Sequence, residues 1–189
     1  MTVFSTCIKV NEWMSEFDQP WGIAGGWAID LSIGKETRQH SDVEVAIFRE
    51  DQHLFKKALL DWSFEKAVNG EFIYWNEEWL ELPVHEIHGI HKQDGERLEV
   101  LLNEVKASEW IFRRKSSISF PESSLFLQSK EGIPYLHPAV VLLYKAKNTC
   151  EKDHDDFFAV KDLLKGEDKN WLYNALQIHV PEHKWIQEL

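Results

Sequence analysis

The first part of the chain shows helical and strand-like hydrophobic patterns in quick succession. Trp13, Met14 and Phe17 share one face of a helical pattern. A glycine pair separates a short apolar run from a second helical pattern that ends at Gly34, and a strand rich in β-branched residues follows. The predicted elements are a helix over Val10–Phe17, a strand over Trp21–Ala24, a helix over Trp27–Ile33 and a strand over Asp42–Phe48.

The middle of the chain changes to a period of two. A helix from Glu50 to about Asp61 comes first, with acidic residues in its first turn and lysines later. Alternating apolar and polar residues then predict successive strands joined by the turns Asn69-Gly70 and Asp94-Gly95. These strands cover Phe64–Val68, Phe72–Trp75, Val84–His88 and Arg97–Leu102.

The last third of the chain is predicted to be mainly helical. Short strands over Ser116–Ser119 and Leu125–Gln128 precede a helix with Pro138 in its first turn. Acidic residues at 152–156 are expected to cap an amphipathic helix that includes Phe157 and ends at Gly166. The predicted helices are Ala139–Lys147, one reaching about Leu164, Asp168–His179 and a short one from Pro181.

Composition restricts the class of protein. A length of 189 residues with 43% hydrophobic content fits one domain, or one domain with a small appendage. Two cysteines make no disulfide framework, which favours a cytoplasmic location, and no apolar run approaches the length of a membrane span. The formal charge of −11 argues against a nucleic-acid partner and permits a cationic one.

The strongest chemical signal is a pair of acids at the start of the predicted strand 42–48. Side chains two residues apart on a strand share a face, so Asp42 and Glu44 are expected to lie side by side. Two adjacent carboxylates suit water or a cation, and hard oxygen ligands suit Mg²⁺. A solvated edge strand is the simpler alternative, and the upstream pair Gly25-Gly26 shifts the balance toward a ligand site because glycine lets backbone approach closely.

The spacing of these residues resembles a known family. The segments GGWAID and TRQHSDVE resemble the signature of the DNA polymerase β-type nucleotidyltransferase superfamily. Within it, the likeness is to the aminoglycoside-2''-adenylyltransferases and lincosamide nucleotidyltransferases, and residues 97–114 and 132–158 resemble later blocks of that branch. The resemblance implies an α/β (α+β) fold with a mixed, largely antiparallel sheet. It also implies a nucleotidyltransferase core over 1–115 and a C-terminal, mainly helical region over 116–189 that packs on the core.

The resemblance also implies a third acid on a neighbouring strand. Glu99 alternates with the core residues Leu98 and Val100, and by resemblance it joins Asp42 and Glu44 in holding two Mg²⁺ ions, with ATP as co-substrate. Glu99 either completes the second metal site or takes the proton of the attacking hydroxyl, and the sequence leaves both roles open. In both positions, 44 and 99, glutamate stands where aspartate is commoner in the superfamily.

Further residues are expected to contact the nucleotide. The backbone amides of Gly25 and Gly26 would cradle phosphate beside the positive end of the following helix. Arg38 and His40 precede the acids and either contact the triphosphate or pair locally with acidic residues. Lys145 and Lys147 end a predicted helix, and one of them either reaches the phosphates or both are solvated.

A zinc site offers a rival interpretation. His85, His88 and His91 are regularly spaced, and imidazole is a zinc ligand. On a strand, however, residues at this spacing lie on alternate faces. Gly89 is also expected to end the strand. Exposed strand and turn histidines are the favoured interpretation.

The function predicted from sequence is therefore transfer of a nucleoside monophosphate. The expected reaction moves AMP from ATP to a hydroxyl of a small molecule, such as an aminoglycoside-like amino sugar, and releases pyrophosphate. A non-catalytic nucleotide-binding or antitoxin-like relative of the same fold is the first alternative, which retention of all three acids disfavours. A nucleotidyltransferase acting on a protein or a tRNA end is the second, which net acidity disfavours for tRNA. The acceptor and the oligomeric state are left open.

Overall fold

The computed structural model describes residues 3–189 and is built on a mixed sheet of ten strands. Its main path runs β4-β3-β5-β6-β2-β1-β10-β9, while β7 pairs with β6 and β8 pairs with β7. Neighbours are antiparallel except for β2 with β6 and β1 with β10. The strands are β1 Trp21–Ile23, β2 Glu44–Phe48, β3 Trp62–Val68, β4 Glu71–Tyr74, β5 Glu86–His91, β6 Arg97–Lys106, β7 Glu109–Ile111, β8 Ser119–Pro121, β9 Phe126–Gln128 and β10 Pro134–Leu136. The predicted mixed, largely antiparallel sheet is confirmed.

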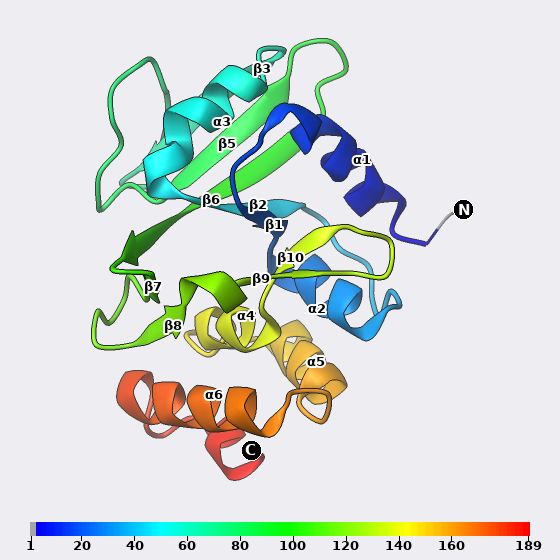
Figure 1. Cartoon of the computed structure of the whole chain (residues 1–189), viewed down its shortest axis with the longest axis vertical. Helices are drawn as coiled ribbons and strands as arrows, with labels where there is room; N and C mark the ends of the chain where they lie inside the picture. The colour runs from blue at the N-terminus through cyan, green and yellow to red at the C-terminus, as the bar shows by residue number, and fades with distance from the viewer. Residues whose placement is uncertain (1–2) are drawn as a thin grey trace.

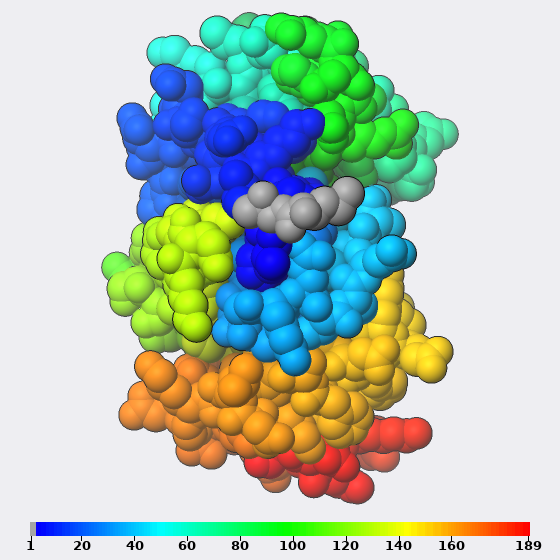
Figure 2. Space-filling view, turned by 90° about the vertical axis from the view of Figure 1, so that its right-hand side faces the viewer, coloured from blue at the N-terminus to red at the C-terminus, as the bar shows by residue number. Residues whose placement is uncertain are grey.

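Helices cover the sheet and extend it at one end. In Figure 1, α3 lies with β3 and β5 at one end of the molecule, and α4, α5 and α6 lie at the other. The helices are α1 Ser5–Trp13, α2 Gly25–Ile33, α3 Gln52–Ala58, α4 Pro138–Lys145, α5 Glu151–Val160 and α6 Gly166–His179, with short 3₁₀ turns at Met14–Glu16, Arg49–Asp51, Glu122–Ser124 and Lys184–Gln187. The space-filling view in Figure 2 shows the C-terminal helices forming a separate layer beyond the segment that contains α2.

Strand β2 lies in the middle of the sheet because its sequence can be buried on both faces. Val45, Ala46, Ile47 and Phe48 are all buried, as expected for a strand with covered faces and a continuous apolar run. Glu44 is the partly exposed residue at its start. A polar residue at the end of a buried central strand places the acid at the edge of the core.

Several predicted boundaries are wrong, and local hydrogen bonds explain one of them. Helix α5 begins at Glu151, so the acids at 152–156 lie inside the helix rather than before it. Asp153 accepts hydrogen bonds from the backbone N–H and the thiol of Cys150, which fixes the start of α5. Gly166 is the first residue of α6 and does not end the preceding helix.

Strands β7 and β10 were not predicted. Both have three residues, too few to show an alternating pattern. Through β9 and β10 the main sheet continues beyond residue 115, so the predicted C-terminal region supplies strands as well as helices. The division into a core over 1–115 and a C-terminal region over 116–189 stays a prediction.

Strand β5 continues through Gly89, contrary to the expectation that this glycine ends it. A Cβ at Gly89 would lie 2.9 Å from Phe64 Cε1 and 3.0 Å from the ring of Trp62. The glycine therefore makes room for two aromatic rings of the neighbouring strand β3 and does not act as a strand breaker.

Within residues 3–189, no helix combines the length and the apolar character needed to cross a membrane. Cys7 is buried, Cys150 is exposed, and both are free thiols.

Candidate active site

The register between β2 and β6 brings the predicted acids together. Glu44 and Glu99 are direct partners across these two parallel strands, and Asp42 lies two residues before Glu44. The backbone N–H of Glu99 also donates to the carbonyl of Val43, which extends the pairing toward Asp42. The predicted strand 42–48 begins at Glu44, so Asp42 is an exposed residue on the loop that enters the strand. The three acids are therefore neighbours at the start of the central strand β2.

Burial and neighbouring acids both raise the pKa of Glu44 and of Glu99. Burial raises the pKa of Glu44, and nearby Glu86 and Asp42 raise it further, although Lys145 acts in the opposite direction. Burial, together with Glu44, Glu86 and Asp42, raises the pKa of Glu99 to about 7. The carboxyl group of Glu99 is thus surrounded by negative charge, which a bound cation would relieve.

The glycine pair lies directly against these side chains. Gly25 and Gly26 form the first turn of α2, and Gly25 has a φ angle of +60°. A Cβ at Gly25 would lie 1.6 Å from Oε2 of Glu44, and one at Gly26 would lie 2.2 Å from Nη2 of Arg38. The glycines are required because side chains of the site fill the space that a Cβ would need. Their expected contact with phosphate is not tested by this arrangement.

Arg38 and His40 pair with acids, which is the second of the two roles considered for them. Arg38 donates from Nε and Nη2 to the two carboxylate oxygens of Asp156 at 2.8 and 2.9 Å. His40 Nε2 lies 2.7 Å from Oδ2 of Asp30, and the His40 ring packs 4.3 Å from the ring of Trp27. The partner of Arg38 is distant in sequence, so this pairing is not the local one that was expected.

The two candidate lysines have different surroundings. Lys145 Nζ lies 2.7 Å from Asp153 and 2.9 Å from Asp156. Its positive charge also lowers the pKa of Glu44. Burial alone would lower the pKa of Lys145, but its contacts with these two acids raise it. Lys147 is exposed, and no hydrogen bond or ion pair within residues 3–189 joins it to the acids. The structure therefore brings Lys145, but not Lys147, to the site.

Two groups beside the acids were not connected with them from the sequence, where His88 was considered only in a rival zinc site with His85 and His91. Glu86 and His88 lie on β5, where His88 pairs directly with Glu99 of β6, and His88 Nε2 is 2.5 Å from Oε1 of Glu86. Their spacing of two residues on a predicted strand was a usable signal, because it places both on one face. The other missed group is Asp156, whose role depends on tertiary packing that no local pattern reveals.

A cavity of about 690 Å³ gives access to the acids. Asp42, His88 and Glu99 line it, together with the aromatic residues Trp27 and Phe72. Aromatic side chains together with polar groups are found in small-molecule sites. The cavity therefore places room for a small molecule beside Asp42 and Glu99.

The donor atoms at this site fit Mg²⁺. Asp42, Glu44 and Glu99 supply carboxylate oxygens, the ligand type that hard divalent cations prefer. Burial and neighbouring negative charge raise the pKa of Glu44 and Glu99, and a divalent ion would offset both effects by stabilising the carboxylates. Asp42, Glu44 and Glu99 are the residues that would hold the Mg²⁺ ion.

Comparisons with known proteins show what this chain is similar to. A family model described as aminoglycoside-2''-adenylyltransferase matches residues 6–157. No match was found among curated proteins. The crystal structure of the lincosamide antibiotic adenylyltransferase LnuA with lincomycin bound shares 16% sequence identity, with a TM-score of 0.58 over 87% of this chain and 100% of that one.

Two structures of ANT(2'')-Ia are also similar. The solution structure of this antibiotic-resistance factor is 17% identical, with a TM-score of 0.57 over 94% of this chain and 97% of that one. The crystal structure of ANT(2'')-Ia in complex with adenylyl-2''-tobramycin is 13% identical, with a TM-score of 0.62 over 93% of this chain and 98% of that one. At these identities the structures show a shared fold, and they confirm the predicted polymerase β-like nucleotidyltransferase architecture.

Proposed function

Since this chain belongs to the aminoglycoside-2''-adenylyltransferase family and is a nucleotidyltransferase, we propose that it transfers AMP from ATP to a small hydroxylated acceptor. The acceptor class that fits best is an amino sugar of the aminoglycoside type. The charge of −11 supports a cationic acceptor, because an acidic surface attracts positive ligands. LnuA with its lincomycin and ANT(2'')-Ia with its adenylylated tobramycin are related precedents for antibiotic acceptors.

The observation that carries the proposal is the pairing of Glu44 with Glu99 next to Asp42. Asp42 and Glu44 would hold Mg²⁺ against the triphosphate, and Glu99 would complete the carboxylate set. Bound Mg²⁺ supplies Lewis-acid stabilisation of the charge that develops on the phosphoryl oxygens. These three acids together would bind two Mg²⁺ ions.

In the proposed reaction, the acceptor hydroxyl oxygen attacks the α-phosphorus of ATP. A new oxygen–phosphorus bond forms, and the bond from the α-phosphorus to the bridging oxygen of the β-phosphate breaks. Pyrophosphate leaves with that electron pair. The hydroxyl proton passes to Glu99, whose carboxylate accepts no hydrogen bond from residues 3–189 and lines the cavity.

Other residues of the site are assigned to the nucleotide. The N–H groups of Gly25 and Gly26 lie at the positive end of α2, where backbone donors and the helix dipole favour phosphate. The side chains of Arg38 and His40 lie beside Gly26. Asp156 pairs with Arg38, and Asp30 pairs with His40. Lys145 supplies positive charge near Glu44. Lys147 receives no role in this proposal.

The test incubates the protein with labelled ATP, Mg²⁺ and a panel of amino sugars, and it measures turnover as the release of pyrophosphate. Wild-type protein is expected to release pyrophosphate in an acceptor-dependent manner, and Asp42→Asn is expected to lower the rate at least about 100-fold because a metal ligand is lost. The matched control is Asp155→Asn, an exposed acid on α5 that should retain full activity. Tight ATP binding without turnover on any acceptor would instead indicate a non-catalytic nucleotide-binding relative.

A further inference from the structure

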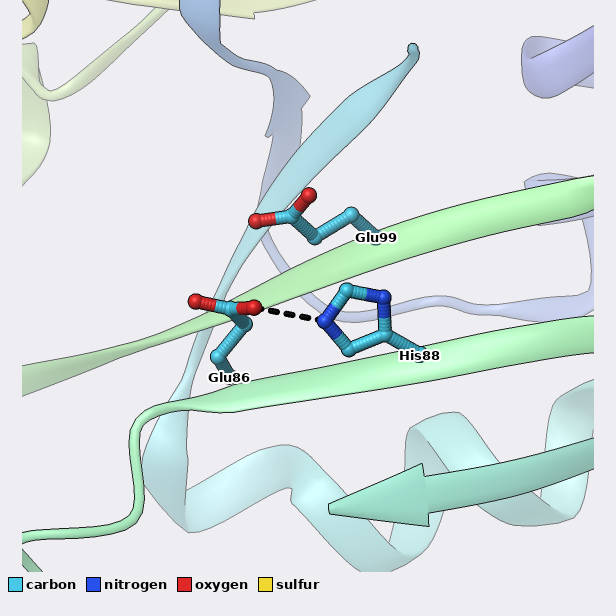
Figure 3. A group of neighbouring side chains, drawn as sticks. All are labelled: Glu86, His88 and Glu99. Carbon is cyan, nitrogen blue, oxygen red and sulfur yellow. Dashed lines mark hydrogen bonds and ion pairs between the residues drawn. The ribbon is translucent and has the colours of Figure 1, made fainter. Parts of the chain in front are cut away.

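Strand β5 presents a polar pair next to Glu99 that the proposed transfer reaction does not use. Glu86 and His88 are two residues apart on β5, and the antiparallel register sets His88 directly opposite Glu99. One ligand atom from each of these three residues lies within 4.8 Å of the other two. Figure 3 shows Glu99 extending from β6 above the Glu86–His88 pair on β5.

We propose that Glu86, His88 and Glu99 form a site for a divalent transition-metal ion, with Zn²⁺ the best fit. An imidazole nitrogen and two carboxylate oxygens form a donor set that zinc accepts readily, whereas Mg²⁺ favours oxygen ligands alone. For first-row ions, affinity for such a mixed site generally rises toward the end of the series. This site is therefore chemically distinct from the all-carboxylate set of Asp42, Glu44 and Glu99, although Glu99 belongs to both.

The geometry needs only small side-chain movements. Zinc–ligand bonds of 2.0–2.2 Å in a tetrahedral arrangement place ligand atoms about 3.4 Å apart. His88 Nε2 and Glu86 Oε1 are hydrogen-bonded at 2.5 Å. The ligand atoms of the three residues all lie within 4.8 Å of one another. Replacing the hydrogen-bonded proton by an ion would open the first distance slightly, and rotation about the side chain of Glu99 would close the others. The fourth position would face the cavity, which His88 and Glu99 line.

The charges around the cluster also favour a cation. The side chain of Glu99 makes no hydrogen bond or ion pair within residues 3–189, and the charged groups acting on it are the acids Glu44, Glu86 and Asp42. His88 contacts Glu86, and Lys145 offsets part of the negative charge at Glu44. Both Glu86 and His88 are partly exposed, with side chains 30% and 29% accessible, so an ion from solvent can reach them.

The inference rests on the proposed function in one respect, because Zn²⁺ bound to Glu99 would remove this carboxylate from the transfer reaction. The site would then make the enzyme sensitive to inhibition by zinc. Zinc binding itself is independent of any turnover and can be measured on the protein without nucleotide.

The experiment is a titration of the nucleotide-free, full-length protein with Zn²⁺ in the presence of a competing chelator dye. Wild-type protein is expected to bind one ion, and His88→Ala and Glu86→Gln are each expected to weaken binding at least about tenfold. The matched control is His85→Ala, because His85 lies just before β5 and its Nδ1 contacts the carbonyl of Pro83 instead. A second reading comes from ¹⁵N NMR, in which Zn²⁺ but not millimolar Mg²⁺ should shift the imidazole resonances of His88.

Asp42→Asn separates this inference from the proposed function. It is expected to abolish transfer while leaving Zn²⁺ affinity within about threefold of wild type, since Asp42 is not one of the three ligands. Zinc binding without transfer in the wild-type protein would refute the proposed function alone. Absence of zinc binding, or equal affinity in wild type and in folded His88→Ala and His88→Gln, would overturn the inference alone.

Discussion

At the scale of single residues, Gly25 and Glu44 constrain each other. The left-handed backbone at Gly25 and the carboxylate of Glu44 leave no space for a Cβ between them. A substitution that adds one methyl group here therefore acts on a proposed metal ligand without changing any charge.

Gly25→Ala is predicted to lower the transfer rate at least about tenfold, because the new methyl group would displace the carboxylate that lies 1.6 Å from its position. Gly34→Ala is the control. Its φ angle of +81° imposes a similar backbone penalty of about 1 kcal/mol, but no atom lies within 4 Å of the added Cβ. Steady-state rates and urea unfolding of both variants check this. Equal loss of activity in the two variants would show that backbone strain, not displacement of Glu44, is responsible.

Glu99 makes the stability of the metal-free protein depend on pH. Its pKa is about 7 in the folded chain against an ordinary value of 4.5, so the folded state binds the proton more tightly. Below about pH 4.5 both states hold the proton and there is no penalty. As pH rises from 4.5 to 7 the unfolded state loses the proton first, so this group destabilises the fold progressively, and above pH 7 the full penalty remains.

Glu99→Gln is therefore predicted to stabilise the chelator-treated protein by about 1 kcal/mol at pH 8, after allowance for partial solvent screening. The gain should fall toward zero near pH 4.5. Urea denaturation across this pH range measures it. Glu71→Gln, an exposed residue of β4, should show no such trend. A gain that is constant with pH, or a loss at pH 8, would contradict the assigned repulsion.

At the scale of elements, the link between α5 and the loop before β2 depends on one carboxylate. Asp156 is fully buried and pairs with Arg38 of that loop and with Lys145 at the end of α4. Contacts with these two cations overcome the effect of burial and lower the pKa of Asp156. Three separate segments thus meet at a single side chain.

Asp156→Ala is predicted to destabilise the protein by about 3 kcal/mol, because it leaves the mostly buried Arg38 without its carboxylate partner and Lys145 with Asp153 alone. Asp155→Ala changes the adjacent, exposed residue of α5 and should alter stability by no more than about 0.5 kcal/mol. Urea unfolding at pH 7 compares the two. Similar small effects in both variants would mean that Arg38 and Lys145 find other partners at little cost.

These elements also show what the sequence could and could not reveal. Alternation predicted the faces of β6 correctly, since Leu98 and Val100 are buried while Glu99 is partly exposed. The acids of the site followed from spacing and family resemblance. The ion pair of Arg38 with Asp156 could not be predicted, because its partners are 118 residues apart and only tertiary packing joins them. Strand β10 was missed because three residues carry no period and its pairing with β1 is non-local.

At the scale of the whole molecule, the C-terminal segment contributes to both the sheet and the helical layer. Strand β10 pairs with β1, β9 pairs with β10, and α4 and α5 pack against α2. Helix α2 is strongly apolar, and its residues Ala28 and Ile29 are completely buried. Removal of the segment 116–189 would therefore expose one edge of β1 and much of the surface of α2 (Figure 1).

A fragment of residues 1–115 is accordingly predicted not to fold by itself, although it contains all three proposed catalytic acids. Exposure of buried apolar surface costs about 25 cal/mol per Å², and domains are stable by only about 5–15 kcal/mol, so we expect the loss of cover over α2 and β1 to unfold the fragment. Circular dichroism during urea titration should show no cooperative transition for the fragment, whereas the full-length chain should show one. Co-expression with the segment 116–189 should restore the transition if the two parts associate. A cooperative transition of the fragment alone would establish that 1–115 is an autonomous domain and that β9 and β10 add to a core that is already complete.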